Sequence, residues 1–231
     1  MSELDAPGLV VRARGLRVRY GPVHVLDDVD FAAAQGEVVA ITGVNGAGKS
    51  TLLTCLAGLH KPSGGAVEVL GGPPRDTPGF WRQVVFVADL PTWYPGLTVR
   101  EHLELVRLTN APVDDWSMDP DYLIEAFGLT ARADAIPLTL SSGQRQRLSL
   151  ACALARPSSL LLLDEPEQSL DTGFRGELAR LLGEDYAPAG GTVIMATHDL
   201  GFAAAAGARR VQIEDGHGFD VAGPEVAGTS A

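Results

Sequence analysis

The chain of 231 residues has little cysteine and no long apolar run, and both scarcities exclude classes of protein. Its two cysteines, Cys55 and Cys152, are too few for a disulfide framework and lack the spacing of a metal site. No apolar stretch reaches the ~18 residues that a membrane-spanning helix needs, and residues 1–5 have neither the basic nor the apolar region of a secretion signal. We therefore expect a cytoplasmic protein with reduced, buried thiols.

Positive charge is also scarce, and lysine in particular. The 18 basic residues against 29 acidic residues give a net charge of −11, which disfavours non-specific binding to nucleic acid or anionic lipid. We expect no nucleic-acid partner. Only Lys49 and Lys61 are lysines, so a lysine within a motif is informative.

Apolar segments alternate with helical patterns along most of the chain. Residues 37–42, 84–88, 159–164 and 192–197 are the continuous apolar runs of strands buried on both faces. Shorter strands are predicted at 66–70 and 209–214, and helices at about 49–58, 144–155 and 172–186. This alternation predicts an α/β fold with a largely parallel sheet, in a single domain over residues 1–231.

Three regions depart from this alternation. Residues 9–20 alternate apolar and basic side chains, which predicts half-exposed strands that turn at Gly15. Residues 98–138 carry two helical patterns punctuated by proline, and we interpret them as an inserted helical lobe. Residues 216–231, rich in glycine and alanine, are predicted to form a loose tail.

The strongest motif follows the first buried strand. Residues 43–51, GVNGAGKST, fit the phosphate-binding loop G-x-x-x-x-G-K-[ST]. The glycines let successive backbone N–H groups point at phosphate oxygens, and the following helix directs its positive end to the same place. Lys49 is then expected to reach the β- and γ-phosphates, and the Ser50 hydroxyl to bind Mg²⁺. The predicted nucleotide-binding residues are Gly43, Val44, Asn45, Gly46, Ala47, Gly48, Lys49, Ser50 and Thr51.

A second motif ends a later strand. Residues 160–166, LLLLDEP, place two carboxylates directly after an apolar run. Asp164 at the strand end is expected to hold Mg²⁺, and Glu165 to polarise the attacking water as general base. Together with the phosphate-binding loop, this segment predicts a nucleotide-hydrolysing site.

A third motif indicates which family of nucleotide-hydrolysing proteins the chain resembles. Residues 140–144, LSSGQ, precede a helical pattern, and Ser141 lies 23 residues before Asp164. The segment closely resembles the LSGGQ signature of ATP-binding cassette (ABC) proteins, with Ser142 in place of a glycine. The resemblance runs from about residue 9 to residue 214. It implies a P-loop NTPase with a RecA-like core sheet, an N-terminal antiparallel β subdomain and an inserted helical subdomain.

The same resemblance assigns roles at further positions. It implies that Ser141, Ser142, Gly143 and Gln144 bind the ATP held by an opposite subunit. It implies that the aromatic Tyr20 stacks on adenine, and that His198 contacts the γ-phosphate. Ser169, Leu170 and Asp171 resemble the D-loop, which lines the dimer interface. Asp89 stands where the family has a glutamine that touches Mg²⁺, and we expect it to take that role.

The resulting expectation is an ATPase subunit of an ABC transporter. Lys49, Glu165 and His198 are its predicted catalytic residues, with ATP and Mg²⁺ bound between two cassettes of a homodimer or heterodimer. The partner is then an integral membrane subunit on a separate chain, which this chain meets at the cytoplasmic face of the membrane. A soluble ABC ATPase acting in cofactor or complex assembly is the alternative. Substrate and direction of transport stay open at this level.

A P-loop kinase or a GTPase is a weaker alternative. No N-K-x-D-like segment that would recognise guanine is present, and the signature motif has no place in those folds. A non-catalytic regulatory cassette is disfavoured because Lys49, Glu165 and His198 are all retained.

Overall fold

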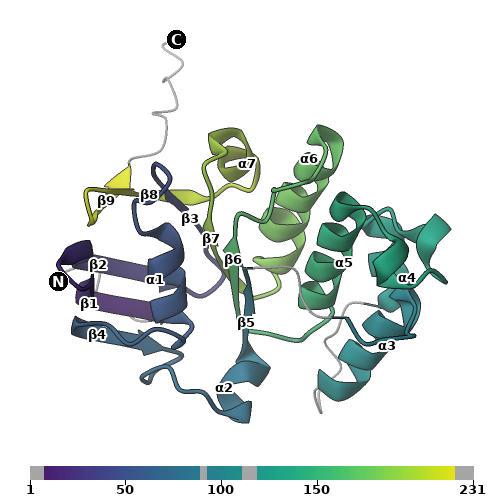
Figure 1. The fold of residues 1–231 in the computed structure, drawn as a ribbon, viewed down its shortest axis with the longest axis horizontal. Helices are drawn as coiled ribbons and strands as arrows, with labels where there is room; N and C mark the ends of the chain where they lie inside the picture. The colour runs from purple at the N-terminus through teal and green to yellow at the C-terminus, as the bar shows by residue number, and fades with distance from the viewer. Residues whose placement is uncertain (1–7, 89–92, 111–118, 222–231) are drawn as a thin grey trace, which may run out of the picture.

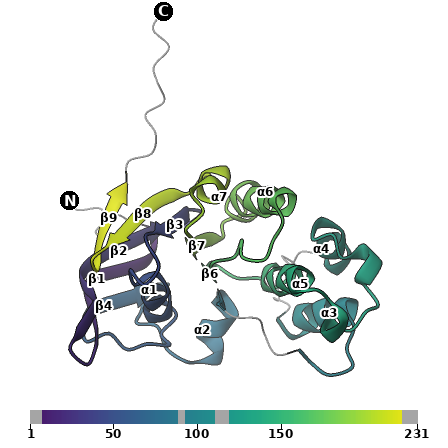
Figure 2. The same ribbon diagram turned by 45° about the horizontal axis from the view of Figure 1, so that its top comes forward.

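The computed structural model describes residues 8–88, 93–110 and 119–221. A small antiparallel sheet lies at one end, a larger sheet in the middle and a helical lobe at the other end (Figure 1). Figure 2 shows the same order from a second direction, with helix α1 beside the small sheet and α3, α4 and α5 grouped at the far end. The predicted α/β class with a separate antiparallel sheet and helical lobe is confirmed.

The small sheet has the order β2-β1-β4, with both strand pairs antiparallel. Strand β1 does not turn at Gly15 as predicted. It continues through that residue with a shift of register between Ala13 and Leu16, because it pairs with a strand on each side. The strands are β1 (Leu9–Tyr20), β2 (Val23–Ala34) and β4 (Gly64–Val69).

The larger sheet has the order β5-β6-β7-β3-β8-β9. The pairs from β5 to β8 are parallel, and β9 closes the edge antiparallel to β8. The predicted loose tail is therefore wrong for residues 217–221, which form β9. The strands are β3 (Val38–Thr42), β5 (Val84–Val87), β6 (Leu160–Asp164), β7 (Thr192–Ala196), β8 (Arg209–Glu214) and β9 (His217–Val221).

Helices cover both faces of the larger sheet, which explains the continuous apolar runs of its strands. Val39 and Ile41 of β3 point into a core shared with helix α1 and the small sheet. Val38 and Ala40 point into a second core, shared with α5, α6 and the helical lobe. The helices are α1 (Lys49–Leu56), α2 (Pro78–Gln83), α3 (Val99–Asn110), α4 (Pro120–Ala126), α5 (Ser142–Leu154), α6 (Thr172–Arg180) and α7 (Leu200–Ala205), with a π-helical turn η4 (Leu181–Tyr186) after α6 and 3₁₀ turns η2 (Thr130–Arg132) and η3 (Pro137–Thr139) in the lobe.

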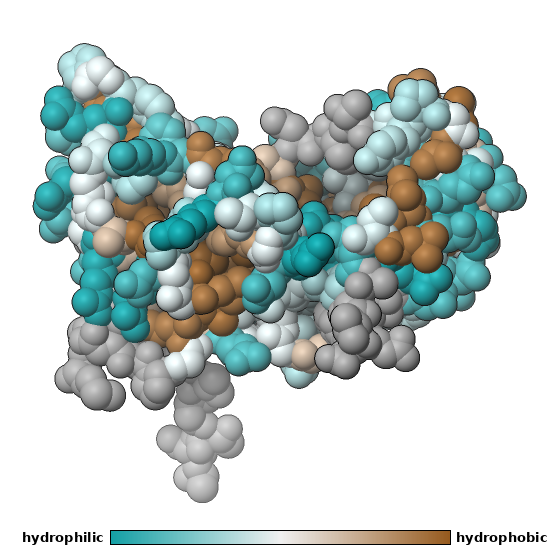
Figure 3. Space-filling model, turned by 90° about the horizontal axis from the view of Figure 1, so that it is seen from below, coloured by the Kyte–Doolittle hydropathy of each residue, from teal (hydrophilic) through white to brown (hydrophobic). Residues whose placement is uncertain are grey.

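The face of the molecule shown in Figure 3 has apolar patches on both the left and the right part, with a hollow between them. Among the described residues, a cavity of about 200 Å³ lies between β5, α3 and α5, and Val85, Val106 and Cys152 are part of its lining. No helix in the described part of the chain has the length and hydropathy of a membrane span. Both cysteines are free, and burial raises the pKa of Cys55 to about 11 and that of Cys152 to about 12, so both thiols stay protonated at neutral pH.

Candidate active site

The predicted catalytic side chains meet because their strands are neighbours. Strands β6, β7 and β3 lie side by side and run parallel. The loops after β6 and β7 carry Glu165 and His198, and Lys49 is the first residue of helix α1, which follows the loop after β3. The carboxyl ends of parallel strands form one edge of a sheet, which is where α/β folds place their ligands.

The phosphate-binding loop leads directly into α1. Gly48 is the N-cap of this helix and has φ of 107°, a conformation that strongly favours glycine. A Cβ on Gly48 would also lie 2.9 Å from the carbonyl oxygen of Val25 on β2. The Lys49 side chain is buried, and its ammonium group donates hydrogen bonds to the carbonyl oxygens of Gly43 at 3.0 Å and Val44 at 3.3 Å. The Lys49 side chain thus folds back over the phosphate-binding loop.

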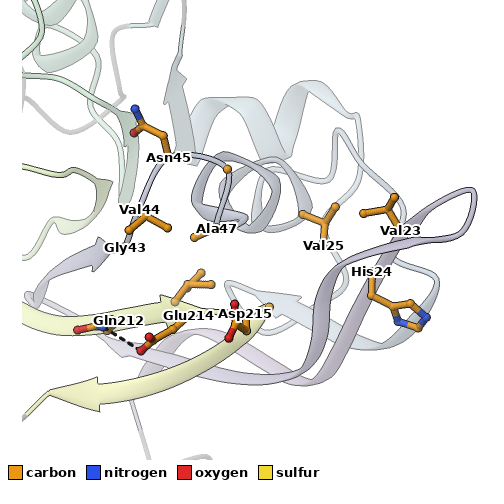
Figure 4. A pocket seen from close by; sticks show the side chains of 13 residues that line it. Val23, His24, Val25, Gly43, Val44, Asn45, Ala47, Gln212, Glu214 and Asp215 are labelled. Atoms are coloured by element: carbon orange, nitrogen blue, oxygen red, sulfur yellow. Dashed lines mark hydrogen bonds between the residues drawn. The ribbon is translucent and has the colours of Figure 1, made fainter.

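A cavity of about 540 Å³ adjoins this loop. Figure 4 shows it between the loop, strand β2 and the turn that joins β8 to β9. Tyr20, predicted to stack on adenine, is not part of the lining. Its half-exposed ring lies 5.2 Å from that of His60, although Val23 directly opposite it does line the cavity. The lining consists of residues 23–25, 43–47 and 212–216.

The general-base candidate is held by two partners. Glu165 Oε2 lies 2.5 Å from Nδ1 of His198, and Glu165 Oε1 lies 3.8 Å from Nζ of Lys49. Glu165 itself has φ of 48°, uncommon for a residue other than glycine, because the chain turns sharply at the end of β6. Its backbone N–H donates to the carbonyl oxygen of Ala196 at the end of β7. The carboxylate therefore stands between the ammonium group and the imidazole.

The residues predicted to hold Mg²⁺ are suited to it in their chemistry. Ser50 is exposed at the start of α1, and Asp164 is half-buried at the end of β6. A hydroxyl and a carboxylate are hard oxygen donors of the kind that Mg²⁺ prefers, alongside water and phosphate oxygens. Asp89, the third predicted metal ligand, lies outside the described residues.

The signature motif forms the N-terminus of α5. Ser141 is the N-cap, and its hydroxyl oxygen accepts from the backbone N–H of Gln144. The Gln144 side chain in turn accepts from the backbone N–H of Ser141, which completes a capping box. Helix α5 therefore begins at Ser142, two residues earlier than predicted. Ser141 and Ser142 are exposed, so this helix end is open to a second molecule.

The residues predicted to form the D-loop, 169–171, pack against helix α5 of the same chain. A Cβ on Gly143 would lie 2.8 Å from the carbonyl oxygen of Ser169, so this position requires glycine for the close approach. Asp171 caps α6 and forms an ion pair with Arg147 of α5. The hydrogen bond from the backbone N–H of Phe174 is the main cause that lowers the pKa of Asp171. Leu170 is buried, whereas Ser169 and Asp171 are exposed.

The sequence did not single out Glu167, which the fold places beside the predicted site. Glu167 is 1% exposed, and one of its carboxylate oxygens accepts a hydrogen bond from the Thr197 hydroxyl. Ligand atoms of Glu165, Glu167 and His198 all lie within 4.8 Å of one another. Burial is the main cause that raises the pKa of Glu167, and the negative charge of Glu165 raises it further, while the Thr197 hydroxyl and His198 lower it.

The raised pKa of Glu167 predicts a pH-dependent contribution to stability. The folded protein binds this proton more tightly than the unfolded chain does, so its contribution is full below pH 4.5 and is lost as pH rises through the folded pKa. Each pKa unit of the shift is worth about 1.4 kcal/mol. Glu167→Gln removes the penalty, so its gain in unfolding free energy over the wild type should grow as pH rises from 5 to 8. Urea unfolding at several pH values measures this gain. Glu104→Gln, on the exposed face of α3, is the control. An equal gain at every pH would contradict the assignment.

Comparison with known proteins gives this arrangement a family. The family model described as ABC transporter matches residues 26–168. The chain is 37% identical to the aliphatic sulfonates import ATP-binding protein SsuB 3 of Pseudomonas savastanoi, over 93% of this chain and 77% of that protein. It is 40% identical to the hemin import ATP-binding protein HmuV of Nocardia farcinica, over 92% and 75%. The glutamine transport ATP-binding protein GlnQ of Escherichia coli is 32% identical, over 94% and 92%.

Solved structures agree with the sequence relatives. An ATP-binding subunit of an ABC transporter superposes with a TM-score of 0.78 at 28% identity, covering 92% of this chain and 90% of that one. A dimeric ABC transporter cassette gives 0.76 at 26% identity, covering 92% and 99%. The same cassette, solved as a post-hydrolysis dimer with ADP and phosphate, gives 0.73.

The fold and the site define a P-loop ATPase, with a nucleotide-binding loop, a carboxylate pair and a signature helix. The chain belongs to the ABC transporter family. Within that family it is the ATP-binding, ATP-hydrolysing subunit that energises transport.

Proposed function

We propose that this chain powers import through a separate integral membrane subunit, with catalysis by Lys49, Glu165 and His198. The observation that carries the proposal is the meeting of these three side chains at one sheet edge, with Glu165 2.5 Å from His198 and 3.8 Å from Lys49. Import is favoured because relatives 37% and 40% identical are named as import proteins. These relatives are named for different substrates, aliphatic sulfonates and hemin.

In the proposed reaction, Lys49 holds the β- and γ-phosphates after it releases the carbonyl oxygens of its own loop. Ser50 and Asp164 would hold Mg²⁺, which would neutralise developing charge on the phosphate oxygens. Glu165 accepts the proton of the water that attacks the γ-phosphorus. His198 orients the Glu165 carboxylate by donating a hydrogen bond to it through Nδ1.

The proposed active form is a head-to-tail dimer of cassettes. Ser141 and Gly143 of one cassette then complete the site of the other, because the start of α5 is exposed and has backbone N–H groups and a hydroxyl to offer a phosphate. A related cassette has been solved as a dimer, which supports this arrangement. The second cassette is either a copy of this chain or a different chain.

The helical lobe and the residues just before it are the proposed docking surface for the membrane subunit. Large apolar side chains are exposed there: Tyr94 is 62% exposed, Leu108 of α3 70% and Leu138 76%. Trp93, next to Tyr94, is half-buried against His102 of α3 and anchors this segment. Exposed apolar side chains that gather on one lobe are typical of a surface that another protein covers. Bound there, the cassette is peripheral to the cytoplasmic face of the membrane.

The proposal predicts a specific membrane partner. A tagged chain, purified from detergent-solubilised membranes of its host with ATP and without it, should recover a multi-spanning protein in stoichiometric amount by mass spectrometry. Introducing Tyr94→Asp and Leu108→Asp together should reduce this recovery at least about tenfold, because two apolar anchors are lost. Leu59→Asp is the matched control, since Leu59 is 56% exposed outside the lobe.

Two outcomes would contradict the docking proposal. Equal loss with Leu59→Asp would indicate that no particular surface is used. Recovery of cytosolic partners alone, or of none, would favour an assembly ATPase over a transporter subunit.

A further inference from the structure

A buried carboxyl group lies behind the proposed catalytic pair and has no part in the reaction as described above. It belongs to Glu167, two residues after Glu165, on the loop between β6 and α6. Its relative exposure is 1%, so water does not compensate its polarity. A glutamate is almost never buried unless it is engaged by a specific partner. Its contacts therefore indicate what it does.

The partner of Glu167 is the residue before His198. The Thr197 hydroxyl donates to Glu167 Oε1 and accepts from the backbone N–H of Asp199 at 3.0 Å. The Thr197 hydroxyl thus links the Glu167 carboxylate to the backbone of Asp199, the residue that follows His198. Thr197 is fully buried, so this link is shielded from water.

The neighbours of Thr197 are held from the same segment. His198 meets Glu165, and Asp199 accepts from the guanidinium group of Arg175 at 3.2 Å. Three consecutive residues after β7 are therefore each held by a side chain from residues 165–175. His198 is 62% exposed in its side chain, so its position depends on these links more than on packing.

We propose that Glu167 is a positioning residue that holds His198 at the Glu165 carboxylate through the Thr197 hydroxyl. The proposal rests on the proposed roles of Glu165 and His198 in hydrolysis. Without the hydrogen bond between Glu167 and Thr197, this segment is still held by the hydrogen bond from the Thr197 N–H to the Ile41 carbonyl oxygen and by the contact of Asp199 with Arg175. Between these two contacts, at His198, the segment is then held less firmly. The imidazole then samples positions away from Glu165.

The test uses variants that separate this role from a merely structural one. Glu167→Leu removes the acceptor and fills the space with an apolar side chain of similar size, but it leaves the buried Thr197 hydroxyl without its acceptor, so some loss of stability should accompany it and urea unfolding checks that the variant folds. Its kcat for ATP should fall about tenfold, the effect of one hydrogen bond of average strength, with KM for ATP unchanged. Thr197→Val, which removes the hydroxyl donor of the same hydrogen bond, should lower kcat by a similar factor with KM unchanged.

Conservative variants that keep the hydrogen bond should keep the rate of hydrolysis. In Glu167→Gln the amide oxygen still accepts from the Thr197 hydroxyl, and Thr197→Ser keeps the hydroxyl, so both should retain kcat near the wild-type value. The double variant Glu167→Leu with Thr197→Val should be no slower than either single variant, because the link can be broken only once.

A spectroscopic readout follows His198 directly. The ring nitrogen shifts of His198, identified among the five histidines by comparison with His198→Gln, should move in Glu167→Leu and in Thr197→Val. They should stay in place in Glu104→Gln, far from the site on α3.

The outcomes are distinct. Full kcat in folded Glu167→Leu or Thr197→Val, or losses that multiply in the double variant, would overturn the positioning role while wild-type hydrolysis leaves the proposed function intact. If Glu167→Leu does not fold, Thr197→Val and the histidine shifts decide the question. If the wild type hydrolyses no ATP with Mg²⁺, the proposed function fails instead.

Discussion

Glu165→Gln is expected to lower kcat for ATP hydrolysis at least about 1,000-fold, within the range that a general base contributes. The amide keeps the size of the side chain and still accepts a hydrogen bond from His198, but it cannot take a proton from water. Lys49 loses only a partner at 3.8 Å, so ATP affinity should be retained. Release of phosphate from ATP measures the rate, and titration with a fluorescent ATP analogue measures the affinity.

The same variant should accumulate as a closed dimer. ATP that binds and is not hydrolysed keeps two cassettes together, so light scattering with ATP and Mg²⁺ should report twice the monomer mass, and the ADP complex should not. Glu167→Gln, two positions away, is the matched control and should keep most of its turnover. Full turnover in Glu165→Gln would show that another group accepts the proton.

Lys49→Met is expected to weaken ATP binding about 100-fold, since charged hydrogen bonds to phosphate are worth about 1.5–3 kcal/mol each. Methionine retains the apolar stem, which is almost entirely buried, and removes only the ammonium group. The carbonyl oxygens of Gly43 and Val44 lose their donor as well, so some loss of stability should accompany the loss of affinity.

Lys61 provides the control for Lys49. It is the other lysine of the chain, and it is exposed. Lys61→Met changes the net charge by the same amount and should leave ATP affinity unchanged. Equal weakening in both variants would show that overall charge, rather than the position of Lys49, governs the affinity. An unchanged affinity in Lys49→Met would remove Lys49 from the nucleotide site.

The buried strands of the larger sheet could be predicted because their sequences reflect their surroundings. Residues 38–42 and 160–163 are buried along their whole length, so every position is apolar or small. The signature helix was predicted within two residues, because Ser141 and Gln144 carry the capping pattern themselves. In these segments the residues that determine the secondary structure are close together in the sequence.

The strands that were missed depend on partners distant in sequence. β2 contains Asp27, Asp28 and Asp30, which are unfavourable in strands, and Arg17 on β1 pairs with the first two of them. β9, with the sequence HGFDV, contains a glycine and an aspartate, which are both unfavourable in strands, and its Asp220 pairs with Arg209 of the neighbouring strand. Gly15 has φ of 55°, which the sequence suggested as a turn and the sheet uses for a shift of register.

The sequence by itself determined the fold class, the phosphate-binding loop, the carboxylate pair and the membership in the ABC transporter family. These features consist of contiguous residues whose chemistry depends on short spacing. Only the tertiary structure revealed the buried contact of Glu167 with Thr197, the ion pair of Arg147 with Asp171 and the close approach of Gly143 to Ser169. Each of these joins residues at least 24 positions apart in the sequence, and the order of strands in the sheet brings the segments that carry them together.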